Sequence, residues 1–229
     1  MDKLNFDQHI SRQFNEDLEE IKTSMLEMGG LVVSQVADAV IALEEADSGI
    51  AERVINTETR IDEMEVDIDE ACTTLIARRQ PAASDLRMVL AVTKTVRDLE
   101  RIGDEAHKIA KMAVMLAEEG AAPKGYVEVR HIGDRVQKML DDSLTAFARF
   151  DADAAIATMR EDEQVNLDYR TALREMITYM MEDPRSISRC LNVLWALRAL
   201  ERVGDHSKNI CEHIVYLVQG RDIRHGGLA

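Results

Sequence analysis

A five-residue pattern with two carboxylates, Glu-Arg-(Ile or Val)-Gly-Asp, occurs twice in this sequence, about a hundred residues apart. The first copy carries Glu100 and Asp104, and the second carries Glu201 and Asp205. A spacing of four residues brings both carboxylates to the same side of a helix, where they repel each other by a few tenths of a kcal/mol. Glycine inside a helix costs roughly 1 kcal/mol relative to alanine. A pattern that accepts both penalties twice indicates a functional site, and carboxylate oxygens are ligands for magnesium, calcium, manganese or iron.

The helix-like stretch that precedes the first copy adds more acids. They are spaced four, three and four residues apart, so they form one row beside an apolar stripe. This row consists of Glu58, Asp62, Glu65 and Asp69. If the two stretches pack side by side, up to six carboxylates face one another. The equivalent row in the second half is thinner and reads Asp162, Asn166, Tyr169 and Leu173. We therefore expect any metal site in the second half to be weaker.

The same carboxylates also have a purely structural interpretation. Arginines stand three residues before the acids, and they would form ion pairs along the helix surface. The pairs are Arg97–Glu100, Arg101–Asp104, Arg198–Glu201 and Arg202–Asp205. The glycines of the two patterns, Gly103 and Gly204, would then simply let a neighbouring helix approach closely. The residues alone leave both interpretations open.

Other residues with chemical potential are isolated. Asp104 and His107 have the carboxylate-x-x-His spacing of di-iron helical bundles, but Lys208 replaces the histidine in the second copy. The remaining histidines are scattered, which is typical of structural or solvated side chains. Trp195, the single tryptophan, lies among leucines and is expected to pack in the core.

The composition limits the classes of function. The chain has 229 residues and a formal net charge of −15, which disfavours binding to nucleic acids and to anionic membrane surfaces. Its beginning lacks the apolar run of a signal peptide, and the longest apolar stretch, CLNVLWALRAL, is too short to span a bilayer. The three cysteines are few and show no CxxC spacing. We therefore expect a soluble cytoplasmic protein with reduced cysteines, no bound nucleic acid and no membrane insertion.

The elements that position these residues are predicted to be helices. Aromatic residues make up 4% of the chain and only three prolines interrupt it, which suits helices better than strands. Apolar residues recur at helical spacing in six long stretches. These stretches cover residues 6–47, 49–78, 84–118, 126–149, 151–181 and 185–219. Asp183 and Pro184 are typical of a helix cap and the first helical residue after it.

The second half of the chain repeats the plan of the first. A shift of 101 residues aligns 97–110 with 198–211, and seven of these fourteen positions are identical. A segment rich in small and turn-forming residues, EEGAAPKGY, lies between the halves. We therefore predict an all-α fold in which six long antiparallel helices form two three-helix bundles in tandem. The first bundle would comprise residues 1–120, and the second, with a short C-terminal tail, residues 121–229.

Several segments together resemble the PhoU family of proteins, and the resemblance spans nearly the whole chain. The segments are ISRQFNEDLEEIK followed by MGG, MEVDIDEACTTLIARRQPAASDLR, the two repeated acidic patterns, LTAFARFDADAAI, ITYMMEDPR and NICEHIVYLVQGRDIRH. The fold of that family, two three-helix bundles in tandem, is the one that the apolar periodicity predicts. Some members carry metal clusters on acidic motifs of both bundles. The resemblance therefore implies divalent or iron-type metal ions bound by Glu58, Asp62, Glu100, Asp104, Asp162, Glu201 and Asp205.

Members of this family regulate bacterial phosphate uptake and are not known as enzymes. The resemblance implies a homodimeric cytoplasmic adaptor between the ATPase subunit of the phosphate-specific ABC transporter and the phosphate-sensing histidine kinase. Such a negative regulator restrains uptake and keeps the phosphate-starvation genes off when phosphate is plentiful. For self-association we expect an exposed apolar flank on the last helix, at Val215, Leu217 and Val218. The alternatives are a metal-dependent helical-bundle enzyme, suggested by the paired carboxylates, and a chaperone-like scaffold, suggested by the methionine-rich helices.

Overall fold

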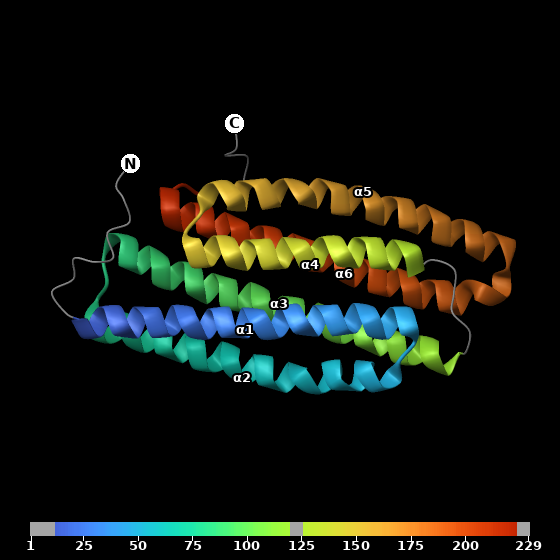
Figure 1. The fold of residues 1–229 in the computed structure, drawn as a ribbon, viewed down its shortest axis with the longest axis horizontal. Coiled ribbons are helices and arrows are strands. Elements are labelled where there is room, and N and C mark those ends of the chain that lie inside the picture. Colours follow the sequence, from blue (N-terminus) through green and yellow to red (C-terminus); the bar gives the residue numbers. More distant parts are fainter. Residues whose placement is uncertain (1–11, 120–125, 224–229) are drawn as a thin grey trace.

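Six long helices make up nearly all of the computed structural model, which describes residues 12–119 and 126–223 (Figure 1). They are α1 (Arg12–Glu45), α2 (Ser48–Arg79), α3 (Ala83–Glu118), α4 (Tyr126–Arg149), α5 (Ala152–Glu182) and α6 (Ile187–Gln219). A short 3₁₀ helix, η1 (Pro184–Ser186), precedes α6, and no strand occurs in the described ranges. The predicted helices are confirmed to within two residues at each described end. The predicted start of the first helix, at residue 6, lies outside the described residues.

Aspartate caps start the second helix of each bundle. Asp47 before α2 and Asp151 before α5 stand at equivalent positions, and their side chains accept hydrogen bonds from the following turn, Asp47 from two backbone N–H groups and Asp151 from one. Such caps satisfy donors that the first turn of a helix leaves unpaired. Asp183 caps η1 in the same way, with Pro184 in the first position. The predicted cap is therefore present, although the turn that it starts is 3₁₀ rather than α6 itself.

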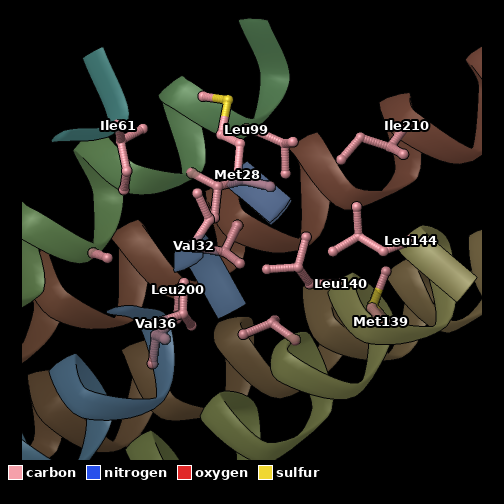
Figure 2. Close-up of a cluster of buried hydrophobic side chains, with 14 of the residues drawn as sticks. Met28, Val32, Val36, Ile61, Leu99, Met139, Leu140, Leu144, Leu200 and Ile210 are labelled. Atoms are coloured by element: carbon pink, nitrogen blue, oxygen red, sulfur yellow. The ribbon is translucent and has the colours of Figure 1, made fainter. Parts of the chain in front are cut away.

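The two sets of three helices pack against each other along their length. α3 contacts α6 at the centre and α1 contacts α4, while α2 and α5 lie on the outside (Figure 1). The buried apolar residues of both sets form one continuous core. Figure 2 shows side chains from helices of both sets converging in this core, among them Met28, Val32, Leu99, Leu140 and Leu200. The duplicated bundles therefore share their apolar interior.

Glycines allow the close contact between α1 and α4. A Cβ atom added at Gly29 would lie 2.8 Å from the side chain of Leu144, and one added at Gly133 would lie 2.9 Å from Val40. The two contacts are equivalent, because the same chain offset relates Gly29 to Gly133 and Val40 to Leu144. α1 continues through Gly29 without interruption. By length and composition α1 could cross a membrane, but half of its most apolar window is buried inside the protein, as in a core helix.

The buried stripe of α6 follows the prediction at its centre and departs from it on either side. The residues at helical spacing that the sequence predicts to face the core are all buried, namely Val193, Leu200, Val203, Ser207, Ile210 and Ile214. Trp195 is 64% exposed, so the prediction that it packs in the core is wrong. It is exposed because it lies on another side of α6 than the buried stripe. The predicted exposed flank is also wrong, since Val215 and Leu217 are buried. The beginning of α3 covers this part of α6, where Arg87 Nε donates a hydrogen bond to the Leu217 carbonyl at 3.4 Å.

Candidate functional site

α2 and α3 lie side by side and bring acids of the first bundle together. The first acidic face consists of Asp62, Glu65, Asp69, Glu100 and Asp104, all at least partly exposed to solvent. Burial raises the pKa of Glu100, and the negative charges of Asp104, Glu65 and Asp62 raise it further. Burial likewise raises the pKa values of Glu65 and Asp69. The carboxylates are thus close enough to disfavour one another's ionised form.

Arginines of α3 partly neutralise the first acidic face. Arg101 lies 3.3 Å from a Glu100 oxygen and 3.6 Å from an Asp104 oxygen. The predicted Arg101–Asp104 ion pair is therefore present. The positive charge of Arg97 counteracts part of the rise in the pKa of Glu65. Arg97 likewise counteracts part of the rise in the pKa of Asp69, so the arginines of α3 act on the acids of α2 as well.

Glu58, at the beginning of the acidic row, has a different partner. Its carboxylate contacts Nδ1 of His107 on α3. The His107 side chain is largely buried, and the contact ties α2 to α3 beside the acidic face. The histidine of the carboxylate-x-x-His pattern, His107, therefore contacts Glu58 of the neighbouring helix.

The second acidic cluster, Asp162 of α5 with Glu201 and Asp205 of α6, is more deeply buried. Lys208 Nζ donates a hydrogen bond to Asp162 Oδ2 at 2.8 Å, and Arg198 pairs with Glu201 at 2.5 Å, as predicted. Burial raises the pKa values of Glu201 and Asp205, and neighbouring acids raise them further. Hydrogen bonding to Asp162 raises the pKa of Lys208. Asp162 and Glu201 are thus each paired with a cation of the chain itself.

The two bundles place these helix-to-helix contacts at the same positions. Asp162 is the equivalent of Glu58, and Lys208 is the equivalent of His107. In both bundles, therefore, a nitrogen base on the third helix approaches a carboxylate on the second. The bases differ, because lysine is positively charged at neutral pH whereas histidine is the side chain that titrates there.

The predicted metal ligands can be compared with these geometries. In the second cluster Asp162 Oδ1 and Glu201 Oε2 are buried without a hydrogen-bond partner, but Lys208 already supplies the positive charge. That cluster therefore suits a bound metal ion poorly. Among the residues that the structure describes, no group of three or more histidine, cysteine or acidic side chains is arranged to hold a metal ion. The metal assignment stays a prediction.

The glycines of the repeated patterns face neighbouring helices. A Cβ atom at Gly103 would lie 3.2 Å from Gln35 Oε1 of α1 and 3.3 Å from Ile61 Cδ1 of α2. At Gly204 it would lie 3.4 Å from Val165 of α5. Both glycines are buried. Close packing of three helices therefore accounts for Gly103, whereas at Gly204 a Cβ atom would lie at an ordinary van der Waals distance from its neighbours.

Sequence analysis missed a polar cluster between the bundles. Asp98 of α3 accepts a hydrogen bond from Asn209 at 3.1 Å, and its two oxygens lie 2.8 Å from His206 Nδ1 and His213 Nε2 of α6. Burial alone would raise the pKa of Asp98, but the hydrogen bonds from His206, His213 and Asn209 outweigh it and lower the pKa to about 2. One buried carboxylate thus ties the two bundles together.

A second tie lies one heptad further along α3. Glu105 is 3% exposed, and its carboxylate lies 3.1 Å from Arg202 of α6 and 3.0 Å from Lys108. Arg202 therefore pairs across the bundles, and the predicted Arg202–Asp205 pair is replaced by this contact. The spacing of seven residues between Asp98 and Glu105 was the available signal, because it puts both acids on the same side of α3.

These observations define a class of protein with two repeated three-helix bundles that are joined by charged contacts at the centre. In each bundle acids gather where the outer helix packs against the central one. The PhoU domain matches this chain twice, at residues 25–113 and 129–214. The chain is 59% identical, over 100% of its length and 89% of the relative's, to the phosphate-specific transport system accessory protein PhoU homolog of Pseudomonas putida. It is 47% identical to the PhoU accessory protein of Escherichia coli, over 99% of this chain and 94% of that one.

Solved structures agree with these matches. The crystal structure of PhoU from Pseudomonas aeruginosa has a TM-score of 0.89 and 58% identity, covering 91% of this chain and all of that one. The phosphate transport system regulatory protein PhoU from Streptococcus pneumoniae has a TM-score of 0.85 and 34% identity, covering 93% of this chain and all of that one. The chain belongs to the PhoU family.

Proposed function

We propose that this protein is the accessory protein of a phosphate-specific transport system and a negative regulator of the phosphate-starvation response. The observation that carries the proposal is the 59% identity, along the whole chain, to a relative named phosphate-specific transport system accessory protein PhoU homolog. The protein would work in the cytoplasm as a homodimeric adaptor between the ATPase of the phosphate ABC transporter and the phosphate-sensing histidine kinase. It would act by binding and would catalyse no reaction.

A binding protein restrains a partner only if it prefers one of that partner's conformational states. Such a preference requires surfaces that keep a defined geometry. The contacts of Asp98 and Glu105 with α6, together with the shared core, favour one arrangement of the two bundles. The outer faces of α2 and α5 are then held at a fixed separation, which suits an adaptor that contacts two partners.

Deletion of the gene in the bacterium that encodes this chain tests the regulatory role. A reporter driven by a phosphate-starvation promoter should switch on in phosphate-rich medium and switch off again when the gene is restored. If the reporter stays off in the deletion strain, the proposed role is wrong. In pull-downs the tagged protein should enrich the transporter ATPase and the kinase over other proteins, whereas a chaperone-like scaffold would show no such preference.

For metal binding, we propose the first acidic face over the second acidic cluster. Glu100 and Asp104 repel each other and the acids of α2, and a bound cation would relieve that repulsion. In the second cluster Lys208 already does so. We therefore expect Asp104→Asn to lower the metal content of the purified protein and the matched change Asp205→Asn to leave it unchanged. Elemental analysis of both variants decides, and equal metal content in both would rule out this assignment.

A further inference from the structure

Exposed apolar side chains gather at the end of one helical hairpin. Of the twelve exposed large apolar residues in the described chain, five lie within the last turns of α5 and the first turns of α6. We call these residues the hairpin patch: Ile177, Met181, Ile187, Leu191 and Trp195. Met181 is 79% exposed and Trp195 is 64% exposed, so the patch is open to solvent.

Helical spacing arranges the patch in two neighbouring rows. Ile187, Leu191 and Trp195 follow one another at intervals of four on α6, and Ile177 and Met181 do so on α5. The two helices run antiparallel and meet at η1 (Figure 1). The rows therefore lie along the outer side of this hairpin, near its turn.

Contacts further from the turn give the register of the two helices. Asp162 meets Lys208, and the Arg198 guanidinium lies 5.9 Å from the centre of the Tyr169 ring. Continuing this antiparallel register toward the turn puts Ile177 opposite Leu191 and Met181 opposite Ile187. The two apolar rows therefore lie side by side between the Arg198–Tyr169 contact and the turn.

Arginines border the patch. Arg170, Arg174, Ile177 and Met181 are spaced four, three and four residues apart, so they share one side of α5. Arg170 and Arg174 are exposed, and neither has a carboxylate within ion-pair distance in the part of the chain that the structure describes. This basic rim stands out in a chain with a formal net charge of −15.

We propose that the hairpin patch binds an amphipathic helix of a partner protein, with aspartate or glutamate residues flanking the apolar face of that helix. Tryptophan, methionine and arginine are enriched at protein interfaces, and tryptophan and arginine dominate their hot spots. Two apolar rows on a helical hairpin match the anchors that a docking helix presents at intervals of three and four residues. The acids of the docking helix would pair with Arg170 and Arg174.

The charges favour this occupant over two others. A second copy that docks through the same patch would bring like-charged arginine rims together across a symmetric interface. An anionic membrane surface extends well beyond the basic rim, so it would also meet the acidic remainder of the chain, which would repel it. The inference rests on the proposed function as an adaptor, because it assigns one partner-binding surface, but its test uses no transport or signalling activity.

Trp195 makes the test direct, because it is the single tryptophan and lies in the patch. The probes are two synthetic amphipathic helices of about five turns with identical leucine faces, one flanked by glutamates and the other by lysines. We expect saturable binding of the acidic peptide, with a blue shift of the Trp195 emission, and at least tenfold weaker binding of the basic one. The double substitution Arg170→Glu with Arg174→Glu should reverse this preference.

Three outcomes would overturn the proposal. The first is that neither peptide binds, and the second is that both bind equally. The third is a Trp195 shift that follows protein concentration or added anionic phospholipid vesicles, which would indicate self-association or membrane docking. The variant Leu191→Asp serves as the patch control, because Leu191 is exposed and its substitution should leave the fold intact by circular dichroism. This variant should lose binding of the acidic peptide, and unchanged binding would be a fourth result that contradicts the proposal.

Discussion

In the first bundle the outer helix α2 carries Glu65 and Asp69, whereas the outer helix α5 of the second bundle carries Tyr169 and Leu173 at the equivalent positions. The backbone plan is the same in both, with a continuous helix packed along its neighbour. The helices α2 and α3 therefore carry acids that repel one another, whereas α5 and α6 carry a short acidic cluster followed by the hairpin patch. A duplicated fold has acquired two chemically different outer faces.

The two bundles also differ in the groups that neutralise their carboxylates. Asp162 is 4% exposed and accepts a hydrogen bond from Lys208, so its charge is neutralised within the protein. Glu58, in the equivalent place, is more exposed and contacts His107. Buried carboxylates need such a partner, whereas water can solvate exposed ones. The comparison therefore predicts that the second bundle depends on its internal cation and that the first does not.

The largest effect is expected from removal of that cation. Lys208→Met would leave Asp162 buried without its partner, and we expect the free energy of unfolding to fall by about 2 kcal/mol. This is below the roughly 3–5 kcal/mol typical of a broken buried pair, because the Lys208 side chain is 38% exposed. Urea unfolding followed by circular dichroism measures the change.

Matched variants make this test specific. Lys208→Arg keeps the charge and should restore most of the stability, and adding Asp162→Asn to Lys208→Met should recover part of it. His107→Gln in the first bundle should cost less than about 1 kcal/mol, because water can solvate Glu58, whose side chain is 30% exposed. Equal losses in the two bundles would contradict the proposed difference.

A smaller effect concerns the pH dependence of stability. The pKa values of Glu65 and Glu100 are raised in the folded state, so the folded protein binds protons more readily than the unfolded chain does. The free energy of unfolding therefore rises as pH falls from 7 toward the ordinary carboxyl range. The pKa of Asp98 is lowered to about 2, so its contribution is complete above about pH 4 and is lost as pH falls toward 2. We expect the highest stability between roughly pH 4 and 5.

Substitutions separate the two limbs of this pH profile. Glu65→Gln with Glu100→Gln should raise stability at pH 7 by about a few tenths of a kcal/mol and flatten the rise on mild acidification. The same double variant should leave the loss below pH 4 unchanged, whereas Asp98→Asn should reduce that loss. Unfolding measured at several pH values tests both limbs. A rise that persists in the double variant would show that other groups produce it.

Local patterns in the chain were sufficient to predict the six helices, their duplication and the acidic rows. The side-by-side position of Asp62, Glu65 and Asp69 follows from helical periodicity, which depends only on near neighbours. The PhoU resemblance followed from the same segments. The outcome for the Gly-Asp patterns was mixed, because helix packing accounts for Gly103 while the metal ligands stay a prediction.

Tertiary structure alone decided which charges meet and which apolar side chains are covered. Arg202 pairs with Glu105 of the other bundle, Asp98 gathers two histidines, Leu217 is buried and Trp195 is exposed. Each of these depends on how α3 packs against α6, and the side chains that meet there are about a hundred residues apart in the chain. Periodicity along one helix specifies the direction of a side chain, but the helix that it meets is determined only when all six pack together.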